Sequence, residues 1–154
     1  MKDIIGYDNY AIDKDGNVWS KNYRRTGKTK KLKCSSDKDG YLMVSLYKDR
    51  KGKTFKVHRL VVEHYLPDFS KELEVDHIDR DRTNNNLSNL RMVTHQQNLF
   101  NNKAKGYYFR KDLTTKPWCA TIRKDTKNNH LGYFATEEEA HQAYLTAKET
   151  MHVI

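Results

Sequence analysis

One stretch, from Glu74 to Asn98, constrains the fold of this chain more than any other. A short apolar strand ends there in adjacent Asp76 and His77, and an asparagine-rich loop leads to a second strand and then to a helix. Neighbours along a strand point to opposite faces, but the chain can bend at a strand end and let both side chains line one cleft. The stretch therefore predicts an α+β unit in which Asp76, His77 and Asn98 converge.

The helix of this stretch has a clear start signal. Thr94 followed by Gln97 is a capping box, so a helix should begin at His95 and carry Asn98 in its first turns. The other expected elements of the stretch are a strand over Leu73–His77, a polar loop over Asp79–Asn89 and a strand over Leu90–Val93.

These residue types suit the hydrolysis of a phosphodiester. That reaction needs an activated water, an offset for phosphate charge and a stabilised leaving oxygen. The Asp76 carboxylate and the Asn98 amide offer oxygen ligands for Mg²⁺ or Mn²⁺, and His77 can accept a proton near neutral pH. The alternative is structural, because asparagine-rich loops are usually turns and an Asp-His pair at a strand end is common.

Composition points to a polyanionic partner. The chain of 154 residues has a net charge of +9 and a pI near 9.4, which favours nucleic acid first and an anionic membrane second. We expect no membrane partner, because no apolar run is long enough to span a bilayer and no signal peptide opens the chain. The two cysteines lack Cys-x-x-Cys spacing, so we expect neither a disulfide scaffold nor structural zinc, and an intracellular, reducing location.

The first part of the chain is predicted to be β-rich and basic. Hairpins are expected over Tyr10–Ser20 and over Tyr41–Val57, the second with a polar turn at Lys48–Lys53, and a helix from His58 should end before Pro67. Lys21–Lys33 holds seven Lys or Arg in thirteen residues and no acid, which favours a clamp on the DNA backbone over a merely solvated loop. The candidate phosphate contacts are Arg24, Arg25, Lys28, Lys30, Lys31 and Lys33.

The last part predicts three strands and one helix. The expected strands are Tyr107–Lys111, Trp118–Arg123 and His130–Phe134. Thr136 and Glu139 form a second capping box, and small or aromatic residues at helical spacing extend the helix to about Met151. The strand region is basic and the helix region acidic, so we expect the sheet to face a polyanion.

The central motifs resemble the HNH homing endonucleases of phages. The matching blocks are Val57–Val61, Val75–Asp79, Asn84–Thr94 and Asn98. The resemblance implies a ββα-metal fold with His77 as general base, Asp76 and Asn98 as metal ligands, and Asn89 as a brace for the loop. It favours one Mg²⁺-like ion, with Mn²⁺ as the alternative, since zinc-binding cysteines are missing.

Other polar residues near these motifs have less direct interpretations. Arg59 is a candidate for supporting the scissile phosphate, with an ordinary helix-surface arginine as the alternative. His95 ranks below Asn98 as a ligand, because the first helical residue is expected to face solvent or phosphate. His58 and His64 are expected to pack or cap rather than to bind metal.

The last segment resembles the DNA-binding domain of the plant APETALA2 and ethylene-response-factor type. The matching blocks are Gly106–Lys111, Trp118–Arg123, His130–Phe134 and Thr136–Tyr144. The resemblance implies a sheet that reads the major groove with a helix behind it. The candidate DNA contacts are Arg110, Lys111, Trp118, Arg123 and Lys124, with core packing as an equal alternative for Trp118.

Together these patterns predict an α+β protein of three modules. Residues 1–54 form a basic β module, residues 55–104 an HNH nuclease domain, and residues 105–154 a β₃α module that reads DNA. The expected function is metal-dependent hydrolysis of double-stranded DNA, with nicking by a monomer favoured. The resemblance also implies a phage-encoded protein in the host cytoplasm. The alternatives are a DNA-binding regulator with an inactive nuclease centre and an RNA-binding protein.

Overall fold

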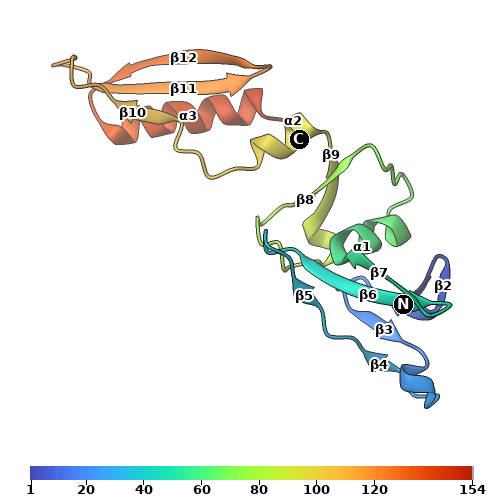
Figure 1. Cartoon of the computed structure of the whole chain (residues 1–154). Coiled ribbons are helices and arrows are strands. Elements are labelled where there is room, and N and C mark those ends of the chain that lie inside the picture. Colours follow the sequence, from blue (N-terminus) through green and yellow to red (C-terminus); the bar gives the residue numbers. More distant parts are fainter. Residues whose placement is uncertain (154) are drawn as a thin grey trace. The chain divides into compact units, whose positions relative to one another are not determined.

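The computed structural model describes residues 1–153 and divides into two compact units, Met1–Thr94 and His95 to the C-terminus (Figure 1). The elements of the first unit are β1 (Lys2–Ile4), β2 (Tyr7–Ile12), β3 (Val18–Ser20), η1 (Tyr23–Arg25), β4 (Lys30–Lys31), β5 (Ser35–Ser36), β6 (Leu42–Lys48), β7 (Lys51–Lys56), α1 (Val57–Tyr65), β8 (Glu74–His77), η2 (Leu87–Asn89) and β9 (Leu90–Val93). Those of the second are α2 (His95–Phe100), β10 (Tyr107–Phe109), β11 (Trp118–Lys124), β12 (Lys127–Phe134) and α3 (Glu137–Met151).

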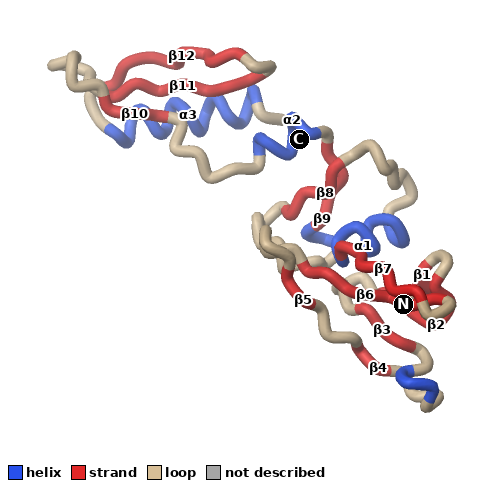
Figure 2. Tube along the Cα trace, viewed as in Figure 1, coloured by secondary structure: helices blue, strands red, loops and turns tan. Residues whose placement is uncertain are grey.

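The strands form small antiparallel sheets, ordered β1-β2-β3-β4, β5-β6-β7 and β8-β9 in the first unit (Figure 2). The predicted first hairpin is confirmed, with Ile12 opposite Val18 across the turn. The predicted turn Lys48–Lys53 is wrong in length, because β6 and β7 continue to Lys48 and Lys51 and leave only Asp49 and Arg50 between them. Both turn residues have positive φ, the geometry of a tight hairpin turn, which the sequence does not signal because neither is glycine.

A single aliphatic core joins the first strands to α1 and to the β8–β9 hairpin. Buried residues come from the N-terminal sheet, from β6, from α1 and from β8–β9; they are Ile4, Ile12, Val18, Val44, Leu46, Val57, Leu60, Val61, Val62, Val75 and Leu90. Along β6, Val44 and Leu46 are buried whereas Ser45 and Tyr47 are exposed, as strand alternation requires. The residues of the predicted modules 1–54 and 55–104 thus share one core, and the boundaries of the three modules stay a prediction.

Helix α1 has the position that its sequence predicts. Its buried residues recur on one face, and it ends at Tyr65, where Leu66 turns extended ahead of Pro67. The Leu66 N–H still donates to the Val62 carbonyl at 2.9 Å, so the last turn is closed. The helix therefore packs a continuous apolar stripe under the strands that lead to Asp76 and His77.

The second unit is a three-stranded antiparallel sheet, β10-β11-β12, with α3 along one face (Figure 1). All three predicted strands are present, although β12 begins at Lys127 rather than His130. The predicted capping box of α3 is confirmed, since Thr136 accepts from the Glu139 N–H while the Glu139 side chain accepts from the Thr136 N–H. The observed architecture is mixed α and β, as the sequence predicts.

Within residues 1–153, the helices are all too short or too polar to cross a bilayer.

Candidate active site

Strand β8 ends in Asp76 and His77, and both side chains are buried, with exposed fractions of 6% and 4%. Buried ionisable residues are uncommon unless they are paired or functional. The two side chains lie against different partners, which give each a separate environment.

Asp76 is held by an arginine from the partner strand. Asp76 lies opposite Arg91 in the β8–β9 register, and the Arg91 Nε and Nη2 atoms lie 2.9 and 2.8 Å from Asp76 Oδ2. Such a charge-assisted pair fixes the orientation of the carboxylate. Sequence reasoning missed Arg91, because only the register shows which residue faces Asp76; an opposite charge on the second strand was the available signal.

His77 lies in a buried polar cluster. Its Nε2 is 3.1 Å from Asn85 Oδ1, and its ring lies 5.1 Å from His58 and 5.9 Å from Tyr41, measured between centroids. Burial first, and then the charges of His77 and Lys56, lower the pKa of His58 to about 3, so His58 is neutral at physiological pH. The His77 ring is therefore packed against an amide and two aromatic rings in the interior of the first unit.

The loop after β8 is held by Asn89. The Asn89 amide donates to Asp79 Oδ1 and to the Asn84 carbonyl, each at 2.9 Å, and accepts from the Asp79 N–H at 3.0 Å. Hydrogen bonds from the Asn84 side chain and the Asp81 backbone keep the pKa of Asp79 below its usual value. These contacts are what a loop brace requires, and the role of Asn89 in activity stays a prediction.

The two histidines of α1 differ in how many of their ring nitrogens are hydrogen-bonded. His64 accepts from the Ile5 N–H at 3.0 Å through Nε2 and bonds the Leu60 carbonyl at 2.7 Å through Nδ1, which makes it a packing residue. His58 Nδ1 is buried and has no hydrogen-bond partner among the described residues. An unsatisfied buried polar atom beside His77 is a feature that functional sites often carry.

Arg59 lies on the half-buried side of α1. Its Nη2 is 3.5 Å from the Leu73 carbonyl, and its guanidinium lies 6.0 Å from the Phe69 ring. These contacts are those of a packed surface arginine. The predicted role of Arg59 in supporting a phosphate stays a prediction.

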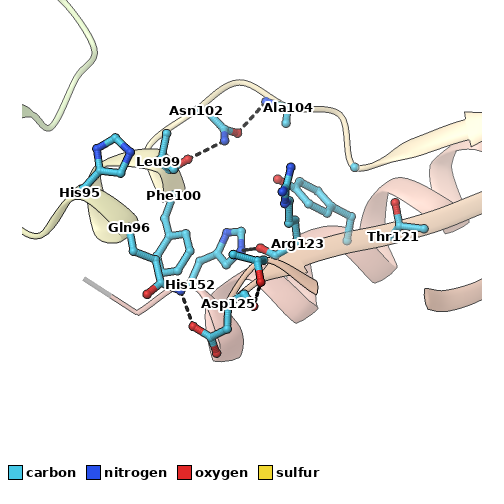
Figure 3. A pocket seen from close by; sticks show the side chains of 13 residues that line it. His95, Gln96, Leu99, Phe100, Asn102, Ala104, Thr121, Arg123, Asp125 and His152 are labelled. Carbon is cyan, nitrogen blue, oxygen red and sulfur yellow. Dashed lines mark hydrogen bonds between the residues drawn. The ribbon is translucent and has the colours of Figure 1, made fainter. Parts of the chain in front are cut away.

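Asn98 lies on α2, the first element of the second unit, and its side chain is half-buried. The contacts of α2 within that unit include a ring stack and a hydrogen bond (Figure 3). Phe100 stacks on His152 with ring centroids 4.0 Å apart, and Gln96 donates to Asp125. His95, the lower-ranked ligand candidate, is exposed at the start of the helix.

A pocket of about 610 Å³ opens beside these contacts (Figure 3). It is lined mainly by α2, by the chain that follows it and by the β11–β12 turn, and His152 closes one side through a 2.8 Å bond from Nε2 to the Arg123 carbonyl. The stacked rings and this bond seat α2 on the second unit and so set the local environment of the helix that carries Asn98.

The predicted ligands are oxygen donors, which suit a hard divalent ion by their chemistry. Asp76 supplies a carboxylate whose Oδ2 also bonds Arg91. The amide oxygen of Asn98 is a second oxygen donor, the ligand type that Mg²⁺ prefers. Within residues 1–153, no group of three or more His, Cys, Asp or Glu side chains is placed to hold a metal ion.

The basic candidates of the N-terminal segment are all exposed. They lie on η1, on the edge strand β4 and in the chain around them; they are Arg24, Arg25, Lys28, Lys30, Lys31 and Lys33. Tyr23 lies beneath two of them, with Lys30 Nζ 4.4 Å and the Arg24 guanidinium 5.3 Å from its ring centroid. An edge strand rich in lysine resists pairing with other strands and leaves its charges available to a polyanion.

The sheet of the second unit separates its candidates between two faces. Trp118 packs edge-to-face with Tyr107 and Phe109, and Tyr107 donates to Glu137 of α3, so this face is the one that α3 covers. This placement favours the packing alternative for Trp118. The strand order places Tyr108 and Tyr133 on the opposite face, through their shared neighbour Cys119.

The remaining candidates of this unit have different surroundings. Arg110 pairs with Asp112 and bonds the Tyr133 hydroxyl at 3.2 Å, and these contacts raise its pKa. Lys111 and Arg123 are exposed, and Lys124 is half-buried. Sequence reasoning missed Tyr108 and Tyr133, which are 50% and 40% exposed beside Arg110; their alternation along the strands was the available signal.

Comparison with known proteins finds a family match over the central part of the chain. Residues 55–99 match the profile of a family described as HNH endonuclease. The predicted resemblance of the central motifs to HNH endonucleases is therefore confirmed for residues 55–99.

Individual relatives extend the match beyond the motif. The chain is 43% identical over 106 residues to DNA endonuclease I-HmuI of Bacillus phage SP01, which is 68% of this chain and 58% of that protein. It is 36% identical over 98 residues to H-N-H endonuclease F-TflII of Escherichia phage T5, covering 62% and 48%. A solved structure of the HNH homing endonuclease I-HmuI, on DNA binding and cleavage, matches with a TM-score of 0.57 and 44% identity over 65% of this chain and 55% of that one. The chain thus spans less than two thirds of the length of these relatives.

Proposed function

We propose that this chain is a metal-dependent DNA endonuclease of the HNH homing type. The observation that carries the proposal is the buried end of β8, where Asp76 is oriented by Arg91 and His77 by Asn85 within the matched segment. The relatives named as endonucleases support the same reaction class.

In this proposal His77 is the general base. It accepts a proton from a water, the resulting hydroxide attacks the phosphorus, and the bond to the 3′ oxygen breaks. The 3′ oxygen takes a proton from solvent water, which leaves 5′-phosphate and 3′-hydroxyl ends. General-base catalysis of this kind is worth about 10²- to 10⁴-fold in rate. The hydrogen bond between His77 Nε2 and Asn85 Oδ1 holds the buried ring in one orientation.

Asp76 and Asn98 are the residues that would hold the metal ion. A bound Mg²⁺, with Mn²⁺ as the alternative, would offset the charge on the phosphate and on the leaving oxygen. Arg91 orients the Asp76 carboxylate, and Asn89 keeps the loop closed behind it.

The outer parts of the chain would bind double-stranded DNA. The exposed cations on and around β4 suit phosphate contacts. The basic sheet of the second unit is the proposed APETALA2-like reader, with Lys111 and Arg123 as DNA contacts and Tyr108 and Tyr133 on the same uncovered side as Arg110. We further propose that the chain acts as a monomer and nicks one strand.

A plasmid-nicking assay with Mg²⁺ tests the proposal. The wild-type chain should convert supercoiled plasmid to the nicked form, and His77→Ala should lose at least about 100-fold in rate with DNA affinity unchanged. Identical behaviour of the two proteins would reject the nuclease and favour a DNA-binding regulator. Addition of a chelator should abolish cleavage by the wild type.

Competition binding tests the partner. Duplex DNA should displace labelled duplex better than single-stranded RNA does, and Lys30→Ala with Lys31→Ala should weaken binding and lower its salt dependence by about one unit per lost phosphate contact. Preference for the RNA would reject duplex DNA as the partner.

A further inference from the structure

The turn between β2 and β3 is docked on the loop that follows β8. The Leu87 N–H donates to the Lys14 carbonyl at 2.7 Å, and the Asn86 side chain donates to Asp15 Oδ1 at 2.8 Å. The turn itself is internally braced, because Asp13 accepts from the Asn17 backbone at 2.8 Å and from Trp19 Nε1 at 3.0 Å. A rigid turn from the N-terminal sheet therefore supports the loop from outside.

Gly16 makes the closest approach in this contact. Its φ is +78°, and a Cβ added there would lie 2.6 Å from Asn85 Cβ and 3.0 Å from the Asn85 carbonyl oxygen. The space between the turn and Asn85 therefore admits no side chain, and glycine also permits this backbone conformation. The turn contacts the backbone and the Cβ atom of Asn85.

Asn85 has one orientation in this position. It is 3% exposed, and its Nδ2 donates to the Thr83 carbonyl at 3.2 Å, so Oδ1 is the amide atom that faces His77 Nε2 at 3.1 Å. An amide oxygen only accepts hydrogen bonds, so Nε2 of His77 must carry a proton. In the neutral ring, Nδ1 is then the nitrogen with the lone pair.

We propose that Asn85 is a positioning residue for His77, and that the β2–β3 turn holds Asn85 in place through Gly16. The inference rests on the proposed role of His77 as general base. It gives the N-terminal sheet a part in the cleavage step in addition to any part in DNA binding.

In the proposed step an O–H bond of water breaks and its proton moves to His77 Nδ1. The oxygen forms a bond to phosphorus, the bond from phosphorus to the 3′ oxygen breaks, and the 3′ oxygen takes a proton from solvent water. The imidazolium that forms still donates through Nε2 to Asn85, and a hydrogen bond from a charged donor is stronger than one from a neutral ring. Asn85 therefore holds the ring in the same orientation before and after the proton transfer.

Two variants of Asn85 test the hydrogen bond in the full-length chain. Asn85→Leu keeps the shape and removes the acceptor, and the single-turnover cleavage rate at saturating protein should fall by about 10- to 100-fold, the range seen when orienting partners are lost. DNA affinity without divalent ions should change less than about twofold, because Asn85 is buried. Asn85→Asp keeps an acceptor oxygen and should recover much of the lost rate.

The His77 Nε2 proton supplies a readout besides activity. In the wild type it should give a slowly exchanging signal in proton NMR of imidazole-labelled protein, because it is buried and bonded. Asn85→Leu should broaden that signal by exchange, and Asn85→Asp should restore it. A purely structural loss would lower the unfolding midpoint of both variants without this difference.

Gly16 offers a matched pair with Gly6. Gly6 has nearly the same φ, +77°, but nothing lies within 4 Å of an added Cβ. Gly16→Ala and Gly6→Ala therefore carry the same backbone strain, and only the first pushes on Asn85. We expect Gly16→Ala to slow cleavage at least several-fold relative to Gly6→Ala.

The outcomes separate this inference from the proposed function. If His77→Ala cleaves like the wild type, the role of His77 fails and this inference falls with it. If His77→Ala is inactive but Asn85→Leu cleaves at the wild-type rate with the same Nε2 signal, only the positioning role of Asn85 is rejected. Equal rates for Gly16→Ala and Gly6→Ala would reject the support from the turn. If Asn85→Leu fails to fold, the Asn85→Asp rate and the glycine pair still decide.

Discussion

The two units differ in which polar residues they bury and in which aromatic residues they expose. Within residues 1–153, every buried polar or charged residue belongs to the first unit, among them Asp76, His77 and Asn85. The second unit instead leaves Tyr108, Phe109 and Tyr133 between 40% and 52% exposed on its strands. Buried polar groups need fixed partners, whereas an exposed sheet can adapt to a ligand. The difference supports a proposed division of labour, in which the buried base of the first unit acts on the phosphodiester and the exposed sheet of the second unit contacts DNA.

The strongest test of this comparison is Asp76→Ala. Removal of a buried carboxylate that is proposed to bind metal should lower the Mg²⁺-dependent cleavage rate by at least about 100-fold and weaken the dependence on metal concentration. Duplex DNA affinity should remain within about twofold. The exposed acid Asp68 supplies the control, since Asp68→Ala should cleave normally. Normal cleavage by Asp76→Ala would remove Asp76 from the site.

The substitution Leu46→Ala tests whether the first unit has one shared core. Leu46 is fully buried in the core that joins β6 to α1, so truncation should cost about 2–5 kcal/mol of unfolding free energy. Trp19 and Trp118 are the two tryptophans of the chain, one in each unit, so a Trp118→Phe background makes Trp19 fluorescence report the first unit alone.

Two controls complete that measurement. Leu99→Ala, at a position that is 58% exposed, should change stability by less than about 0.5 kcal/mol. Hydrogen exchange in α1 should become faster in Leu46→Ala, and unchanged exchange there would show that the N-terminal sheet and α1 are separate modules.

The stability of the first unit should depend on pH through the protonation of His58. Its pKa is lowered to about 3 in the folded chain, whereas the unfolded value is about 6.5, so the unfolded chain binds more protons between these values. Stability is therefore highest above pH 6.5 and falls with acid, by up to about 1.4 kcal/mol per pH unit from this residue. His58→Gln should flatten that slope between pH 6.5 and 4, measured by urea unfolding of Trp19. His130→Gln, an exposed change in the second unit, should leave the slope of the first unit as it is.

The smallest expected effect is at the start of α3. Thr136→Ala removes one half of the capping box and should cost about 1 kcal/mol of stability in the second unit. Thr136→Ser keeps the hydroxyl and should retain most of that energy. Trp118 fluorescence in a Trp19→Phe background follows the unit. A loss of nicking by Thr136→Ala at temperatures where the unit is folded would contradict the proposed division of labour.

Local signals were sufficient for most of the secondary structure. Sequence patterns predict elements that depend only on residues close together in the chain. Examples are the helix before Pro67, the strand that ends at His77 and the capping box at Thr136. The β6–β7 turn was predicted too long, because the positive φ of Asp49 and Arg50 is imposed by the pairing of the two strands rather than by the turn residues.

The candidate site was predictable only in part. Asp76, His77 and Asn98 could be chosen from residue chemistry and family resemblance, because a base and oxygen ligands are recognisable by type. Arg91, Asn85 and Gly16 could not, since their partners depend on strand register and on a contact between segments about 70 residues apart in sequence. The sequence alone thus determined which groups are available for chemistry. Only the tertiary structure decided which of them are buried, paired and oriented, because those properties arise where distant segments pack together.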